Sequence, residues 1–154
     1  MLDFISNFTD KFKAGDFHIE AHKKVKTIQS DFKKNFGLTL RVYKGKQLAD
    51  PNFTLAELNN KTSKKINYGA EDITIKASMT IHEVEQLIDS NFGLTVQIAN
   101  EFDNYCVNNK YTLGQALRQE DLKDWCKGKG FNSIEEWLKS ENCSSVEEYY
   151  SKKK

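Results

Sequence analysis

The sequence predicts an α+β fold made of two duplicated β-α-β-(β) units and a C-terminal array of short helices. A stretch that begins at Asp16 returns 56 residues later at Asp72, and eight positions are identical over residues 16–42. A shorter unit of 12 residues then occurs three times after residue 120. Self-similarity at a fixed period marks repeated supersecondary units. We therefore expect the two large units to form one sheet with helices packed on one face.

The first predicted element is an amphipathic helix over residues 1–15. Its apolar positions are Leu2, Ile5, Phe8 and Phe12. This spacing places the four side chains on one side of a helix. Asp3, Asp10 and Lys11 interrupt the segment, so it differs from the apolar stretch of a secretory signal. We expect a cytoplasmic protein.

The two large units, residues 16–60 and 72–119, open with the alternation of a half-buried strand and continue with helical spacing. The predicted helices bury side chains at matching positions: Val25, Ile28, Phe32 and Phe36, then Ile81, Val84, Ile88 and Phe92. Gly37 and Gly93 stand where each helix should end, a position that favours a left-handed cap. A second strand follows, and a right-handed crossover would connect the two strands of each unit.

In each large unit, the sequence then predicts a short third strand and a short helix that begins with a capping box. Thr54 and Glu57 form this pattern in the first unit, and Thr112 and Gln115 form it in the second. The polar residues 61–70 connect the two units.

The three short repeats occupy residues 120–154. Their first residues are Asp121, Ser133 and Ser145. Each repeat has a helix cap, an acid three positions later and an aromatic residue four positions later, namely Trp125, Trp137 or Tyr149. Helices this short are not stable alone in water, so the aromatic rings must pack on neighbours or on a partner. Because the first repeat adjoins the large units, we expect Trp125 to be the most buried, and Tyr149 and Tyr150 the most exposed.

Charge is distributed unevenly along a chain whose net charge is only +1. Residues 1–70 carry 13 Lys and Arg against 7 Asp and Glu, whereas residues 71–120 carry 3 against 8. Opposite charges of this kind help two units to pack together or to attract a partner.

No apolar run approaches the ~18 residues of a membrane span, so we expect no membrane contact.

Patterns that would indicate catalysis or metal binding are few. His18, Glu20 and His22 alternate on one predicted strand face, but the second unit has no histidine or acid there. We interpret them as a solvated face, and we expect no metal and no other cofactor. The chain has three cysteines without CxxC spacing: Cys106, Cys126 and Cys143. No histidine adjoins them in sequence, so we expect free thiols and no enzyme activity.

A second hypothesis concerns the exposed face of the strand after Gly37. This face carries Arg41 and Tyr43, and Lys44 and Lys46 follow. An arginine and an aromatic ring on an open sheet can stack on RNA bases. The second unit has no aromatic residue there, which favours an ordinary basic surface. Nucleic-acid binding is therefore the alternative, and a small enzyme with a site between the units comes third.

The favoured hypothesis is a non-enzymatic protein–protein interaction module, either for a partner or for self-association. Its candidate contact residues lie in the tail: Trp137, Tyr149 and Tyr150. Residues 36–58, FGLTLRVYKGKQLADPNFTLAEL, resemble a stretch of uncharacterised small α+β proteins of gut Bacteroidetes. The resemblance covers the two large units better than the tail. It implies a bacterial cytosolic α+β protein and no site residues.

Overall fold

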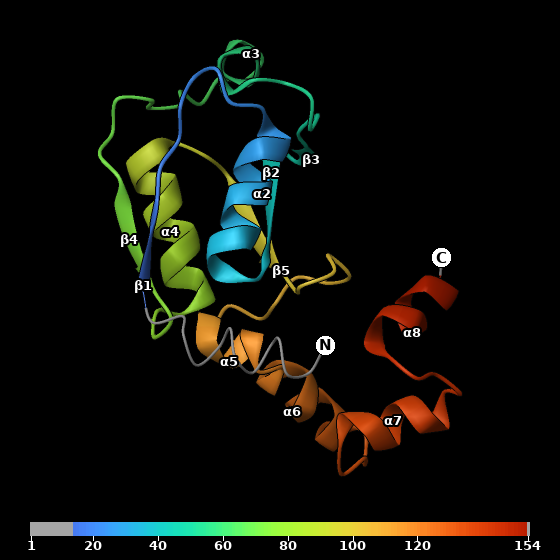
Figure 1. Cartoon of the computed structure of the whole chain (residues 1–154). Coiled ribbons are helices and arrows are strands. Elements are labelled where there is room, and N and C mark those ends of the chain that lie inside the picture. Colours follow the sequence, from blue (N-terminus) through green and yellow to red (C-terminus); the bar gives the residue numbers. More distant parts are fainter. Residues whose placement is uncertain (1–13, 154) are drawn as a thin grey trace.

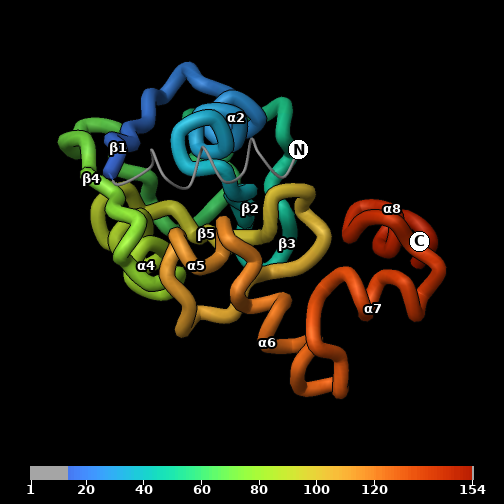
Figure 2. Tube along the Cα trace, turned by 60° about the horizontal axis from the view of Figure 1, so that its bottom comes forward, coloured from blue at the N-terminus to red at the C-terminus, as the bar shows by residue number. Residues whose placement is uncertain are grey.

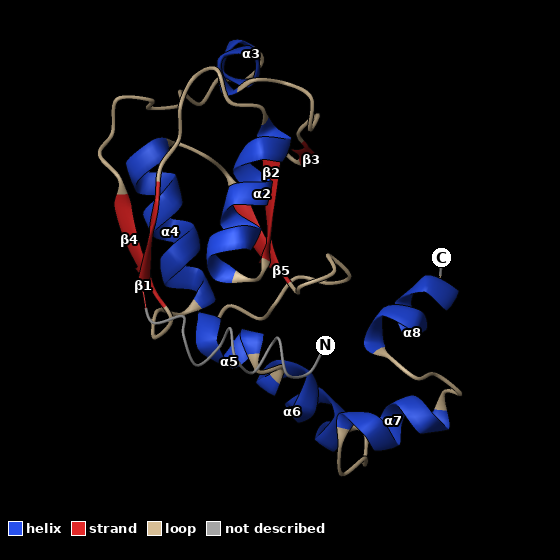
Figure 3. Ribbon diagram, in the orientation of Figure 1, coloured by secondary structure: helices blue, strands red, loops and turns tan. Residues whose placement is uncertain are grey.

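The computed structural model describes residues 14–153, which form seven helices and five strands in an α+β arrangement (Figures 1 and 3). Most of the predicted N-terminal amphipathic helix falls on residues 1–13, outside the described residues. Its last two residues, Ala14 and Gly15, belong to a strand instead. No helix among residues 14–153 is long and apolar enough to cross a membrane.

The strands form two small antiparallel sheets, so the prediction of a single sheet is wrong. β1 (Ala14–Phe17) pairs with β4 (Ile73–Lys76). β2 (Thr39–Lys44) pairs with β5 (Val96–Ala99) on one side and with β3 (Gln47–Leu48) on the other. The first and second strands of each unit thus lie in different sheets, and the expected crossover does not form among the described strands. Sequence alternation indicates which side chains are buried, but it does not identify the neighbouring strand.

Helices α2 (Val25–Phe36) and α4 (Ile81–Phe92) lie between the two strand pairs, and each packs against a strand of both sheets (Figures 1 and 2). Their buried residues follow the predicted spacing, including the phenylalanine at the end of each helix, and all are inaccessible to solvent. Gly37 and Gly93 end the helices with φ angles of 80° and 72°. Both left-handed caps are therefore confirmed.

Phe17 of β1 connects the two long helices within the core. Its ring meets Phe32 of α2 and Phe92 of α4 edge to face, with the centroids 5.8 Å apart in each pair. Such aromatic pairs add about 0.5–1.5 kcal/mol to the gain from burial. The side chains of both sheets and both long helices belong to one hydrophobic core.

The short helices α3 (Leu55–Asn60) and α5 (Leu113–Leu117) begin with the predicted capping boxes. In α3, the hydroxyl of Thr54 accepts the N–H of Glu57 at 3.1 Å. The connector between the units packs onto the same helix, because the hydroxyl of Tyr68 donates to the carbonyl of Leu55 at 2.9 Å. The connector is thus fixed on the domain surface.

Each short helix attaches to the start of a long helix by the same backbone contact. The N–H of Val25 donates to the carbonyl of Phe53, and the N–H of Ile81 donates to the carbonyl of Tyr111, both at 2.8 Å. These bonds satisfy N–H groups that the first turn of an α-helix leaves without a partner. The short helices therefore fix where the long helices begin.

Helices α6 (Glu120–Gly128), α7 (Ile134–Ser140) and α8 (Val146–Lys152) form the tail, which extends away from α5 and the large domain in Figure 1. Ser133 and Ser145 cap α7 and α8, as predicted. The tail has a separate core, whose buried residues are Leu122, Cys126, Trp137, Leu138 and Val146. The chain thus contains one large and one small hydrophobic core.

The prediction that Asp121 caps the first tail helix is wrong. Helix α6 begins one residue earlier, and its N-cap is Gln119, in a left-handed conformation with φ of 60°. Only two residues separate the end of α5 from the start of α6, so the chain turns sharply at this residue. Asp121 consequently lies inside the first turn of α6 rather than before it.

Candidate interaction groove

A row of five aromatic rings runs through the tail and reaches the large domain. Its centroid distances are 5.2 Å for Trp125–Trp137, 4.6 Å for Trp137–Tyr149, 5.1 Å for Tyr149–Tyr150 and 5.7 Å for Tyr150–Tyr105. The 12-residue repeat places one ring at the same point of each short helix, and the three helices bring these rings together. The last contact joins α8 to the segment that follows β5.

The predicted burial order of the tail aromatics is wrong. Trp137 is 2% exposed, whereas Trp125 is 45% exposed, and Tyr149 and Tyr150 are half-buried. The middle ring is covered from both sides, because Trp125 and Tyr149 pack against it. Trp137 is therefore a core residue that a partner cannot reach directly, and only the two tyrosines of the predicted contact set retain exposed surface.

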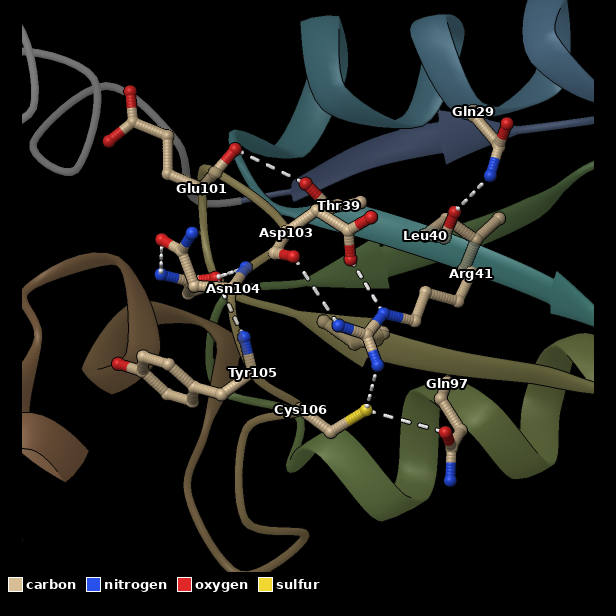
Figure 4. Close-up of polar contacts among 12 residues, drawn as sticks. Gln29, Thr39, Leu40, Arg41, Gln97, Glu101, Asp103, Asn104, Tyr105 and Cys106 are labelled. Carbon is tan, nitrogen blue, oxygen red and sulfur yellow. Dashed lines mark hydrogen bonds and ion pairs between the residues drawn. The ribbon is translucent and has the colours of Figure 1, made fainter. Parts of the chain in front are cut away.

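The segment 100–106, here called the β5–α5 loop, holds a compact turn beside the tail (Figure 4). The side-chain oxygen of Asn100 accepts the N–H of Asn104 at 2.6 Å and the N–H of Tyr105 at 3.3 Å. Asp103, with φ of 56°, provides the left-handed residue of the turn. These bonds fix the loop that carries Phe102 and Tyr105 toward the tail.

An apolar groove of about 740 Å³ opens between the β5–α5 loop and the three tail helices. Its apolar walls are Phe102 from the loop, Ile134 and Leu138 from α7, and Val146 from α8. Phe102 belongs to neither hydrophobic core, and its half-buried ring has a cation–π contact with Lys33 of α2, whose Nζ lies 5.8 Å from the ring centroid. Ligand sites in proteins commonly measure about 300–1,000 Å³ and have mostly apolar walls.

The rim of the groove carries charges of both signs. Lys123 and Lys127 of α6 line one side, and they stand four positions apart, on the same helix face. Glu135 of α7 and Glu147 of α8 supply negative charge. An occupant that places acidic groups near α6 and basic groups near α7 and α8 would complement this rim.

Asp121 and Tyr105 form a polar contact between the tail and the β5–α5 loop. Burial raises the pKa of Asp121 above its ordinary value, and its Oδ1 atom has no hydrogen-bond partner among the described residues. Burial, together with the charge of Asp121, also raises the pKa of the Tyr105 hydroxyl. Tyr105 therefore stays neutral at physiological pH, as its half-buried position requires.

The predicted basic face is occupied in part by contacts within the chain (Figure 4). Nε of Arg41 donates to Asp103 at 2.6 Å, and Nη1 lies 3.1 Å from the sulfur of Cys106. Partial burial disfavours the charged form of Arg41, but the hydrogen bond and charge of Asp103 outweigh it and raise its pKa. The hydroxyl of Tyr43 donates to Gln97 at 2.6 Å. A nucleic acid that stacked on these side chains would have to displace these contacts.

The remaining predicted residues lie apart from the groove. Lys44 and Lys46 are exposed at the turn between β2 and β3. The carboxylate of Glu20 lies 3.2 Å from Nε2 of His22 and 4.0 Å from Nε2 of His18. Among residues 14–153, no three His, Cys, Asp or Glu side chains form a group that could hold a metal.

The three cysteines are free thiols in different environments. Cys126 is buried in the tail core, and burial raises the pKa of its thiol. Cys106 is exposed beside Arg41, and Cys143 is half-buried.

The sequence did not identify the apolar walls of the groove, although a partial signal was present. Leu122, Ile134 and Val146 occupy the same position of the 12-residue repeat, one residue after each predicted helix start. That periodicity indicated a common face but not which of its members would line a groove. Phe102 gave a weaker signal, as a single apolar residue in the polar run 100–104.

Comparison with known protein families, with curated proteins and with solved structures gives no significant match.

Proposed function

We propose that this chain is a non-enzymatic interaction module that binds an amphipathic helix of a partner protein in the tail groove. The observation that carries the proposal is the apolar groove of about 740 Å³ between Phe102 and the tail helices. Helix-in-groove recognition uses apolar anchors spaced three or four residues apart, which enter a groove of this chemistry. Each buried anchor of the size of leucine or phenylalanine contributes about 1.5–3 kcal/mol.

The charges on the rim support a helix with one acidic and one basic flank. Lys123 and Lys127 would face its acidic flank, whereas Glu135 and Glu147 would face its basic flank. Such complementarity acts mainly on orientation and on the rate of association. The rigid β5–α5 loop supports the proposal further, because a wall fixed before binding loses little conformational entropy when the partner binds.

We also infer that the large domain is a duplicated scaffold that presents this loop and the tail. Arg41 of β2 lies opposite Gln97 of β5, and Phe17 of β1 lies opposite Ile73 of β4. In both pairs the two residues are 56 positions apart, the same offset that relates the two sequence copies. This register supports a pairing of equivalent strands about a local two-fold axis.

A peptide-display selection tests the binding proposal. Helical amphipathic peptides selected on the wild-type chain should bind Phe102→Ala at least about tenfold more weakly, a loss of about 1.4 kcal/mol. Leu48→Ala is the matched control, because Leu48 is another large apolar residue outside both cores and is 61% exposed on β3. Fluorescence anisotropy would measure both affinities.

The proposal fails if the selected peptides bind Phe102→Ala and the wild type equally well. It also fails if the two variants lose the same affinity, because a general apolar surface would then explain the binding. A thermal melt of each variant shows that the tail is still folded, which separates loss of binding from loss of structure.

A further inference from the structure

A second pocket has a volume of about 320 Å³. The segments that line it lie at the end of the large domain that carries α3 and β3, away from the tail (Figure 1). Three segments surround it: the β2–β3 turn at residues 43–45, the connector at residues 61–64, and residues 93–95 between α4 and β5. Leu58 and Ile66 supply the apolar part of its lining.

The polar lining of this pocket is basic and rich in hydroxyl groups. It contains Lys44, Lys61 and Lys64, and no carboxylate lines it. Hydroxyl groups come from Thr62, Ser63, Thr95 and Tyr43. Those of Tyr43 and Thr62 already donate to Gln97 and to the carbonyl of Lys64, so Ser63 and Thr95 supply the hydroxyl donors that a ligand could use. Ammonium and hydroxyl donors together are the side chains that proteins use to bind phosphate oxygens.

Two of the three lysines carry charge that no acid offsets. Lys64 forms an ion pair with Asp89 and also donates to the hydroxyl of Thr95 at 3.2 Å. Lys44 pairs with Gln47 through its backbone, but its side chain has no hydrogen bond or ion pair with any residue in the described range 14–153. Lys61 lies 5.4 Å from the ring centroid of Phe53, a cation–π contact that leaves its positive charge in place.

The walls of the pocket are held in place by backbone contacts. A Cβ atom at Gly93 would lie 2.2 Å from the carbonyl oxygen of Lys65, so the connector rests directly on the end of α4. The N–H of Ile66 donates to the side chain of Asn59 at 2.9 Å, which fixes the connector from the other side. The lysines are thus presented on rigid backbone, which lowers the entropic cost of binding.

We propose that this pocket binds a small phosphate-bearing molecule. Lys44 and Lys61 would contact the phosphate oxygens, Lys64 would position Thr95, and the hydroxyl groups of Ser63 and Thr95 would donate the remaining hydrogen bonds. A volume of about 320 Å³ is at the small end of protein ligand sites and holds about ten waters at their liquid density. A diphosphate or a sugar phosphate is small enough to enter this pocket.

Inorganic pyrophosphate is the probe for the test, titrated into the full chain and followed by amide NMR. We expect shift changes at residues 44–45, 62–64 and 95, and an affinity that falls at least about tenfold in the double variant Lys44→Gln/Lys61→Gln. The matched control is Lys26→Gln/Lys34→Gln. It removes the same charge from the exposed surface of α2 in the same basic unit, outside this pocket.

Equal losses of pyrophosphate affinity in the two double variants would overturn the proposal, because they would show that pyrophosphate is attracted to basic charge in general. Shift changes spread over lysines across the surface would overturn it as well. A single-stranded oligonucleotide provides the last arm. If the oligonucleotide binds more tightly than pyrophosphate and changes the amide NMR signals of α2 as well as those of the pocket, the lysines bind a nucleic-acid backbone. The small-molecule proposal is then wrong.

Discussion

Trp137→Ala should unfold the tail and leave the large domain folded. Trp137 is 2% exposed and packs between Trp125 and Tyr149, with ring centroids 5.2 Å and 4.6 Å away. Replacing a buried tryptophan by alanine costs about 3–5 kcal/mol. The tail is short, and at about 0.05–0.15 kcal/mol per residue its 33 residues, 120–152, have roughly 2–5 kcal/mol of stability. The substitution therefore removes about as much stability as the tail has.

Hydrogen exchange followed by mass spectrometry measures this outcome segment by segment. Amides of α6, α7 and α8 should lose protection in Trp137→Ala, whereas those of α2 and α4 should keep it, because Trp137 belongs only to the tail core. Trp125→Ala is the control, since a ring that is 45% exposed supports less packing and its loss should leave the tail protected.

Two results would refute this reasoning. If α2 and α4 lose protection together with the tail, the two cores form one cooperative unit rather than two. If the tail keeps its protection in Trp137→Ala, the central ring is not what stabilises it.

Two further predictions concern a glycine and a carboxylate. Gly93→Ala should lower the free energy of unfolding, measured by urea denaturation, by about 2–4 kcal/mol. The new Cβ would clash with the carbonyl of Lys65, and alanine would have to adopt the left-handed φ of 72°. Gly45→Ala, with φ of 62° and open space around it, should cost only about 1 kcal/mol, and equal costs would contradict the clash. Hydrogen bonds from the N–H and hydroxyl of Ser144 lower the pKa of Glu148 from 4.5 to about 2. Its stabilisation of α8 is therefore complete above pH 4.5 and is lost as the pH falls toward 2. An NMR titration of the Glu148 carboxyl group should give a midpoint near pH 2. A midpoint near pH 4.5 would show that the hydrogen bonds from Ser144 do not form in solution.

Local features of the fold were predictable because neighbouring residues determine them. The buried stripes of α2 and α4 follow from the 3.6-residue period, and the capping boxes follow from residues three positions apart. The pairing of β1 with β4 was not predictable, because it joins residues about 58 positions apart whose pattern would suit other partners. The same applies to the groove. The loop that carries Phe102 is held by bonds of Asn100 within it and by a hydrogen bond from the distant Thr39 to the carbonyl of Glu101.

The pairing of strands also constrains the order in which the chain can fold. Neither large unit contains both strands of a long pair, since β1 needs β4 and β2 needs β5. During synthesis, the first unit leaves the ribosome before the strands it pairs with exist, so β1 keeps an open edge until residue 76 has emerged, and β2 until residue 99 has emerged. Contacts this distant in sequence slow folding, because a long loop must close before they form. The nascent first unit is therefore the stage at which this chain is most exposed to aggregation.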